Sequence, residues 1–451
     1  MILRSILLAT SLLASVGAFQ MRKYHAASNS VRSLPTSLHS TSISIDRTAP
    51  REIGQFQEWA VQCGVRPESG FCLVEGRVDG NEDWRAATST GVPRGARALW
   101  VPGEMILSAD RIAQEFQGYA DASLEVLAKK GMQEFIPLYH LYLKVLMEYD
   151  QGTQSPYFYW MNSLPRKWNT AASMDDFCMS CLPPYLKKRC EHKREQVAAF
   201  REATRAFEYL DPWTKTNADV AKFVYNVVMS RSFESDDGDL RLVPVADMLN
   251  HGYPANAALN YDESGNCEVI ATRDIQPGED LLLDYGDVTN PAKLLAKYGF
   301  LFDSPATYCK LVFNNPSKEL LDIGYEPSKL LIGTANGEIA PAVWDVMLYS
   351  RLERKRDAAK DKRAFYEAHM SGDEETKAAI HQKYFKETCN ALRLHVDNIL
   401  AEVSELTVRT NAFDSSKHPR LGVIRRHNES VTATFQKVRT MVEQISGVAV
   451  A

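Results

Sequence analysis

The sequence has no apolar run that reaches the ~20 residues needed to span a bilayer as a helix. It also has no surplus of basic residues, because 52 Lys and Arg stand against 57 Asp and Glu, which gives a net charge of −5. The first absence argues against a transmembrane helix. The second removes the overall basic footprint expected of a nucleic-acid-binding protein. An apolar content of 45% is ordinary for a globular protein, and a chain of 451 residues suggests about three domains.

Cysteine is also scarce. Eight cysteines in 451 residues do not form the framework of a small disulfide-stabilised domain. Four possible zinc ligands are Cys178, Cys181, Cys190 and His192. Their spacing matches no common structural zinc site, so we expect no metal.

Acidic residues are nearly absent from the N-terminal region. Arg4 precedes an apolar run over 6–16 with small residues after it, which is typical of a cleavable signal peptide at 1–18. Residues 20–48 are rich in Ser and Thr and contain a single acid, Asp46. Such a composition cannot bury a core, so it predicts a disordered, transit-peptide-like leader over 19–50.

The most informative stretch is 231–300. Short strands are predicted over 258–261, 267–272 and 281–283, separated by turns, and together they indicate small antiparallel β structure. Two groups of polar residues interrupt this pattern, namely Asp247, Asn250 and His251, and then Asp284 and Tyr285. An Asn-His pair at a strand end offers donors and acceptors to the polar edge of a ligand. It can equally well satisfy a turn.

Helical patterns dominate elsewhere. A short helix is predicted over 51–64, short strands over 84–89, 98–101 and 105–107, and helices through most of 108–228. Ser371 and Glu374 are typical of a capping box. Apolar residues from Phe385 to Leu406 then recur at threes and fours, and a second such stripe runs from Val431 to Ile445. These stripes predict two long amphipathic helices packed against each other.

Several motifs in the central stretch resemble those of one family. They are Ser230-Arg231-Ser232-Phe233, the run from Leu242 to His251, Gly278-Glu279, Asp284-Tyr285-Gly286 and Tyr298-Gly299-Phe300. In order and spacing they resemble the C-terminal half of a SET domain. They are most similar to the subfamily of Rubisco large-subunit lysine methyltransferases and actin-histidine methyltransferases.

The resemblance implies an α+β fold. Its SET domain would consist of small β-sheets, with the Asn-His and Tyr segments packed as a pseudoknot. The implied boundaries are an N-terminal SET part at 51–107, a helical insertion at 108–228, a C-terminal SET part at 229–303, and an all-α substrate-binding domain at 304–451.

The resemblance also implies a function. The chain would transfer a methyl group from S-adenosylmethionine to a side chain of a protein substrate, with Tyr285 as the catalytic residue that orients the accepting amine. No metal and no nucleic acid is implied. The residues implied to bind S-adenosylmethionine are Asp247, Asn250, His251, Tyr298 and Phe300, and those implied to bind substrate are Arg231 and Phe233.

Phe233 bears on the choice of acceptor. The histidine-modifying branch carries a polar side chain at the corresponding place, which can bond the second nitrogen of an imidazole. Phe233 cannot do so, but its ring can pack along the alkyl stem of a lysine. We therefore expect a protein-lysine N-methyltransferase, with a protein-histidine N-methyltransferase as the alternative.

One feature of the family is missing. Its usual Gly-x-Gly would fall at Asp83-Trp84-Arg85-Ala86, and the nearest glycines are Gly70 and Gly80. Glycine allows a backbone to approach a ligand closely. Its loss leaves open a SET-fold pseudoenzyme or protein-binding module, or a structural protein that works through its helical C-terminal part.

The N-terminus carries a second resemblance. The segment from Ala14 to Phe19 resembles the bipartite plastid signal of diatoms and related algae, in which a Phe follows the cleavage point. It implies a plastid address and a plastid protein as a possible substrate. Secretion and a mitochondrial address are the competing interpretations.

Overall fold

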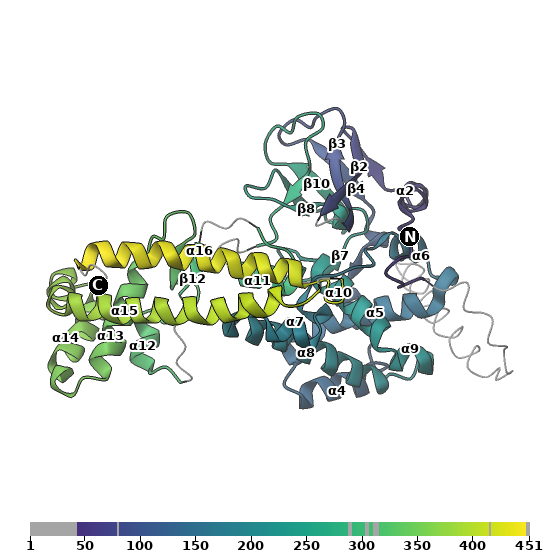
Figure 1. Cartoon of the computed structure of the whole chain (residues 1–451). Coiled ribbons are helices and arrows are strands. Elements are labelled where there is room, and N and C mark those ends of the chain that lie inside the picture. The colour runs from purple at the N-terminus through teal and green to yellow at the C-terminus, as the bar shows by residue number, and fades with distance from the viewer. Residues whose placement is uncertain are drawn as a thin grey trace, which may run out of the picture. The chain divides into compact units, whose positions relative to one another are not determined.

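The computed structural model describes residues 43–78, 81–286, 291–302, 306–309, 315–414 and 416–447 (Figure 1). The expected signal peptide and most of the expected leader lie outside these ranges. The chain divides into two compact units. Unit 1 comprises Met1–Trp168 and Arg194–Asp284, and unit 2 comprises Asn169–Lys193 and Tyr285–Ala451.

Unit 1 contains the small β-sheets expected of the central stretch. Its largest sheet is antiparallel and has the order β1-β4-β10-β9, a hairpin of β2 and β3 stands apart from it, and a third sheet has the order β5-β7-β6. The strands predicted over 258–261, 267–272, 84–89 and 98–101 are confirmed within a few residues at each end. Their bounds are β1 (Arg66–Pro67), β2 (Phe71–Val78), β3 (Asn81–Thr88), β4 (Arg97–Val101), β5 (Leu107–Ser108), β6 (Ser232–Glu234), β7 (Leu240–Leu242), β9 (Ala257–Tyr261) and β10 (Cys267–Ala271).

Helices supply the rest of unit 1. In α5 and α10 most residues are buried, so both form part of its core instead of covering it. The helices expected within 51–64 and 108–228 are confirmed. Their bounds are α2 (Ile53–Gln62), α3 (Ala109–Glu115), α4 (Asp121–Lys129), α5 (Ile136–Gln151), α6 (Phe158–Ser163), α9 (Pro212–Thr216) and α10 (Ala218–Arg231), with 3₁₀ turns at Gly103–Met105, Gln133–Phe135, Gly152–Gln154 and Ala246–Met248. Helix α8 (Pro184–Arg205) begins in unit 2 and ends in unit 1.

The strand predicted over 105–107 is only half right. Met105 belongs to a 3₁₀ turn, because its backbone N–H donates to the carbonyl oxygen of Pro102 at 3.0 Å. The strand itself starts at Leu107, where it pairs with Leu242 of β7.

One short strand pair in unit 1 is parallel. It joins β8 (Asn250–His251) to β11 (Leu282–Leu283), with Asn250 opposite Leu282 and His251 opposite Leu283. The prediction of purely antiparallel structure is therefore wrong for 281–283. Parallel partners need a long connection, and residues 252–281, which contain the β9-β10 hairpin, provide it.

The side chain of Asn256 holds this pair in place. It is fully buried. Its Oδ1 accepts a hydrogen bond from Leu282 N at 2.7 Å, and its Nδ2 donates to Asp280 O at 2.7 Å. Gly252 N adds a bond to Leu283 O at 3.0 Å. The segment that ends at Leu283 is thus bonded along its length by Asn256 and β8.

The described part of unit 2 is helical apart from one short antiparallel pair of strands. Its elements are α7 (Asp176–Ser180), α11 (Pro291–Tyr298), α12 (Lys318–Asp322), α13 (Pro341–Glu353), α14 (Ala359–Ser371), α15 (Glu374–Asn411) and α16 (Leu421–Ser446), the strands β12 (Ala306–Tyr308) and β13 (Leu331–Gly333), and 3₁₀ turns at Ala171–Ser173 and Arg356–Ala358. The two predicted long helices are confirmed as α15 and α16, which lie side by side (Figure 1). Most residues of their apolar stripes, among them Val396 and Val438, lie in one core cluster or pack against it.

Two details of the predicted helix pair are wrong. The N-cap of α15 is Asp373, whose side chain accepts from Thr376 N at 3.0 Å. Ser371 instead ends α14, because Gly372 adopts a φ of +75° and breaks the helix. Phe385 is 42% exposed and stacks on the ring of Trp344, and Ile445 is 45% exposed, so neither belongs to the buried stripes.

Two further findings concern the described ranges as a whole. Within them, no helix is both long enough and apolar enough to cross a membrane. The eight cysteines all lie in these ranges and are free thiols.

We predict that Gly252→Ala destabilises the β8-β11 pair. A Cβ atom at this position would lie 2.5 Å from Leu282 Cδ1 and 2.8 Å from Leu282 Cβ. We expect a loss of about 1–3 kcal/mol in the free energy of unfolding, as for other overpacked sites. Urea denaturation measures this loss. Gly54→Ala is the control, because a Cβ there meets nothing within 4 Å. An equal loss of stability in both variants would show that close packing at Gly252 does not support the β8-β11 pair.

A second stability prediction concerns His427 in α16. Full burial lowers the pKa of His427 to about 4. The unfolded chain therefore binds this proton more tightly than the folded chain, so stability present above about pH 6.5 is lost as the pH falls towards 4. We expect this residue to account for about 2 kcal/mol of the stability lost between pH 7.5 and pH 5.

Urea denaturation of wild type and His427→Gln at both pH values tests the prediction. The variant should lose less stability on acidification, whatever its stability at pH 7.5. His192→Gln changes an exposed histidine and serves as the control. Identical acid sensitivity of wild type and His427→Gln would exclude the titration of His427 as a cause.

Candidate functional site

A strained turn leads into β8. Val245 has a φ of +75° and a ψ of −49°, a conformation that a β-branched residue adopts only under constraint from its surroundings. Hydrogen bonds from Asp247 N to Val243 O (2.9 Å) and from Met248 N to Val245 O (3.1 Å) close the turn. Strained backbone of this kind is concentrated at functional sites.

Buried polar side chains hold the turn. Asp247 Oδ2 accepts a hydrogen bond from Trp160 Nε1 at 3.0 Å. Arg231 Nη1 donates to the backbone oxygen of Asp247 at 2.7 Å and lies 3.2 Å from its Oδ2. Burial raises the pKa of Asp247, and the positive charge of Arg231 opposes that effect. Arg231 and Asp247, both expected at the site, are thus joined to each other here, and direct contact of either with a ligand stays a prediction.

His251 is held as a neutral ring. Its Nδ1 lies 3.3 Å from the carbonyl oxygen of Leu283. A carbonyl oxygen only accepts, so Nδ1 carries the proton and Nε2 is left as an acceptor. Burial lowers the pKa of His251, with the bond to Leu283 and the charge of Asp284 acting in the opposite direction. The ring is therefore neutral at neutral pH.

Asn250 has an acidic neighbour. Its Nδ2 lies 3.4 Å from Asp83 Oδ2, which projects from β3. Asp83 stands where the family's Gly-x-Gly is expected. The residues there form a regular strand, paired with β2 on one side. On the other side, Leu281 N donates to Ala86 O at 2.9 Å, and none of residues 81–88 has a positive φ.

Three aromatic residues form a cluster in unit 2. The ring centroids of Tyr285 and Tyr298 are 4.8 Å apart, and that of Phe300 lies 5.9 Å from Tyr298 and 6.4 Å from Tyr285. The hydroxyl of Tyr298 donates to the backbone oxygen of Tyr285 at 3.4 Å. All three side chains are half-buried. They therefore combine apolar surface with two phenolic hydroxyls.

Gly299 is required between Tyr298 and Phe300. Its φ is +81°, and a Cβ atom there would lie 2.5 Å from the carbonyl carbon of Asn169. A larger residue would separate the aromatic cluster from the segment at 169–170, which belongs to the same unit. The glycine of the motif is thus explained by close backbone packing.

Phe233, the last of the expected substrate-binding residues, lies in β6 of unit 1. It is half-buried and pairs with Arg241 of β7. It lies two residues after Arg231, the last residue of α10, where the chain passes directly from this helix into β6.

The structure thus brings the expected site residues together in groups. Arg231 bonds to Asp247, and Asn250 and His251 share β8 in unit 1, while the three aromatic residues contact one another in unit 2. Sequence analysis missed Trp160, Asp83 and Asn256. Only Asp83 carried a signal, because it occupies a place where glycine was expected.

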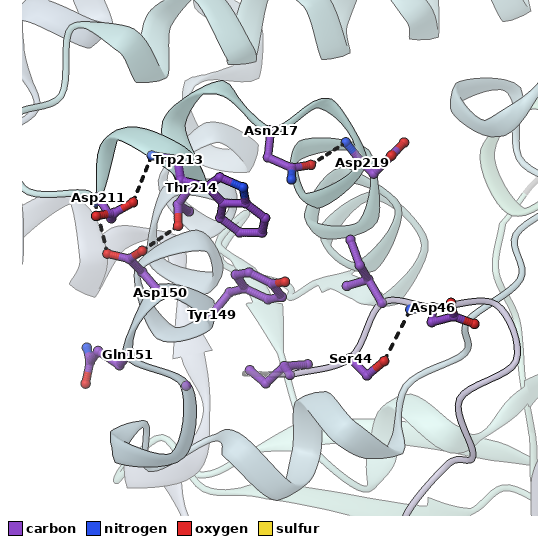
Figure 2. Close-up of a pocket in the computed structure, with 13 residues that line it drawn as sticks. Ser44, Asp46, Tyr149, Asp150, Gln151, Asp211, Trp213, Thr214, Asn217 and Asp219 are labelled. Carbon is purple, nitrogen blue, oxygen red and sulfur yellow. Dashed lines mark hydrogen bonds between the residues drawn. The ribbon is translucent and has the colours of Figure 1, made fainter. Parts of the chain in front are cut away.

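A separate cavity of about 600 Å³ lies in unit 1 and contains none of the expected site residues (Figure 2). Four aspartates line it, and local structure accounts for several of them. Asp211 caps α9 by accepting from Trp213 N, and Asp150 accepts from Thr214 Oγ1 and Asp211 N. These bonds explain the carboxylates of Asp150 and Asp211 without a ligand.

Sequence comparison finds relatives among characterised proteins. The chain is 21% identical to the actin-histidine N-methyltransferase of Rattus norvegicus over 284 residues, which is 58% of this chain and 44% of that protein. It is 26% identical to ribosomal lysine N-methyltransferase 4 of Saccharomyces cerevisiae over 232 residues, or 45% of each protein. The matches thus span less than half the length of these relatives.

Structural comparison finds neighbours over most of the chain. Rubisco LSMT bound to AdoMet aligns with a TM-score of 0.60 and 16% identity, covering 88% of this chain and 92% of that structure. The SET domain of LSMT bound to lysine and AdoHcy aligns with a TM-score of 0.58 and 15% identity, covering 87% and 91%. The expected α+β fold is confirmed.

The family comparison agrees with the motifs and with the fold. Residues 113–286 match the model of the SET domain. This range starts within α3 and ends just after Tyr285, so it includes Asn250, His251 and the parallel β8-β11 pair. Residues 113–286 are therefore identified as a SET domain, and the chain is similar to Rubisco LSMT in structure and to actin-histidine N-methyltransferase in sequence.

Proposed function

We propose that this chain is an S-adenosylmethionine-dependent protein methyltransferase that modifies lysine. The observation that carries the proposal is the Asn250-His251 strand, which is fixed beside β11 within a SET domain and carries a neutral imidazole. The names of the relatives support it, because they include methyltransferases that act on lysine or histidine in proteins. Solved neighbours bound to AdoMet or AdoHcy support the choice of methyl donor.

The residues around β8 suit such a donor. The Asn250 amide both donates and accepts, and His251 offers an acceptor at Nε2, so the pair can bond a purine edge or an amino-acid group. Asp83 adds a negative charge beside Asn250. S-adenosylmethionine carries positive charge on its sulfonium and its α-ammonium, which a nearby carboxylate favours. The resemblance also assigns Tyr298 and Phe300 of unit 2 to this donor, and their rings are apolar surfaces of the kind that an adenine packs on.

The reaction needs positioning more than acid-base chemistry. The amine nitrogen forms a bond to the methyl carbon as the bond from that carbon to sulfur breaks in line, and alignment supplies most of the gain in rate. A lysine with a pKa of about 10.4 must first lose a proton to solvent. In this proposal Tyr285 orients the neutral amine through its hydroxyl, while Arg231 and Asp247 hold the turn in front of β8.

The proposed acceptor rests on Phe233. Its half-buried ring offers apolar surface, which packs along the alkyl stem of a lysine. An imidazole acceptor needs a polar partner for its second nitrogen, and the side chain of Phe233 has no polar group. The competing histidine activity is motivated by the actin-histidine relatives.

The proposed location is the plastid. It rests on the signal-like run over 6–16, on Phe19 and on the basic, Ser- and Thr-rich segment that follows. A plastid protein is accordingly the proposed substrate.

The catalytic prediction concerns Tyr285→Phe. This change keeps the ring and removes only the hydroxyl, so it should reduce turnover about 100-fold by misplacing the amine. Affinity for S-adenosylmethionine should stay nearly unchanged, because the lost interaction acts mainly in the transition state. Transfer of labelled methyl to plastid protein fractions measures turnover, and calorimetry measures affinity.

Asn250→Ala is the matched variant, because we expect this change to act on the affinity for S-adenosylmethionine. It should weaken binding of S-adenosylmethionine by about 1–3 kcal/mol, the cost of leaving polar partners unpaired. If wild type binds no S-adenosylmethionine, the pseudoenzyme interpretation, motivated by the missing Gly-x-Gly, replaces the proposal. Unchanged turnover in Tyr285→Phe would remove Tyr285 from the mechanism.

Peptide mapping of the methylated product tests the acceptor. We expect the label on lysine, and Phe233→Asn should reduce lysine methylation because it removes the apolar wall. Circular dichroism of the variant should match wild type, since the side chain is only half-buried. A label on histidine would show that Phe233 does not determine the acceptor.

A fluorescent fusion of residues 1–50 tests the location. Expressed in a diatom, it should enter the plastid, and Phe19→Ala should divert it. Fluorescence confined to the secretory pathway or the mitochondria would refute the plastid address.

A further inference from the structure

Three potential metal ligands converge in unit 2. They are Asp175 and Cys178, at the start of α7, and His418, in the turn that precedes α16. One candidate ligand atom from each lies within 4.8 Å of the other two, and His418 Nδ1 is 2.9 Å from Asp175 Oδ2. A sulfur, an imidazole nitrogen and a carboxylate oxygen form a donor set that suits Zn²⁺.

Local structure already orients each of these side chains. Asp175 is the N-cap of α7, and its Oδ1 accepts from Cys178 N at 2.7 Å. The ring of His418 lies against Phe177, with centroids 4.6 Å apart, and meets Phe413 edge-on at 6.2 Å. Ligands fixed in this way bind a metal with little reorganisation. In metal proteins, the residues that hydrogen-bond to the ligands and orient them have this role.

Burial and charge also fit a divalent cation. Cys178 is fully buried among apolar residues. One Zn²⁺ with a thiolate, a carboxylate and a neutral imidazole carries no net charge, so it removes the cost of burying the thiolate. The side chains of Asp175 and His418 are 42% and 23% exposed, which leaves a path for the ion.

We propose that Asp175, Cys178 and His418 bind one zinc ion, with water in the fourth position. The ion would join the start of α7 to the turn before α16, two segments far apart in the sequence. This site differs from the cysteine-rich set considered from the sequence, because Asp175 and His418 replace Cys181, Cys190 and His192. It is independent of the proposed methyl transfer.

Cobalt substitution tests the site directly. Full-length protein without a histidine tag is stripped of metal and titrated with Co²⁺. We expect one equivalent to bind with a thiolate-to-cobalt charge-transfer absorption, and Zn²⁺ to displace it. Cys178→Ser should abolish that absorption, whereas Cys190→Ser, which changes another buried thiol, should retain it. Retention of the absorption in Cys178→Ser would overturn the proposal, as would the absence of stoichiometric binding to wild type.

A second pair of variants separates metal binding from folding. Asn is as good an N-cap as Asp, so Asp175→Asn should keep the thermal stability of the metal-free protein. It should still weaken zinc binding at least about 10-fold, measured by competition with a chelator, and His418→Gln should do the same. Zinc should raise the Tm of wild type and raise it less in Asp175→Asn. Equal zinc stabilisation of both proteins would show that Asp175 is not a ligand.

Discussion

The arrangement of the site depends on the pairing of β8 with β11. Two strands of two residues each form few backbone hydrogen bonds, so the pair cannot persist without further support. Asn256 supplies this support, because its buried side-chain amide donates to Asp280 O and accepts from Leu282 N in the segment that contains β11. Gly252 lets that segment approach closely. Through this pairing Leu283 meets His251, which fixes the tautomer of the imidazole.

Strand β8 is supported from its N-terminal side by buried charge. A positive φ at Val245 costs on the order of 1–3 kcal/mol, and it persists only where the surroundings over-determine it. The hydrogen bonds from Arg231 and Trp160 to Asp247 supply that constraint. Removing one partner would leave a buried charge uncompensated. This would cost more free energy than the ion pair contributes to stability. The turn, and hence Asn250, is therefore fixed before any ligand binds.

Local patterns in the sequence predicted much of this fold. The stripes of α15 and α16 and the β9-β10 hairpin follow from periodicity and turn residues within one segment. The parallel β8-β11 pair, the bond from Trp160 to Asp247, and the meeting of Cys178 with His418 do not. Each joins residues far apart in the sequence, and no local propensity encodes such a contact. The motif resemblance identified Asn250 and His251, but not the side chains that hold them.

The missing glycines can be understood from β3. Glycine at such a place serves either a positive φ or close contact between backbone and ligand. Residues 83–86 are extended and paired with β2, and Ala86 also accepts a hydrogen bond from Leu281 N, so their backbone needs no glycine. What changes is the chemistry, because the Asp83 carboxylate now stands beside Asn250. On the proposed function, this negative charge favours a sulfonium over the neutral thioether left after transfer. Electrostatic attraction from a side chain would then take the place of backbone contact, and it would favour methyl donor over spent product.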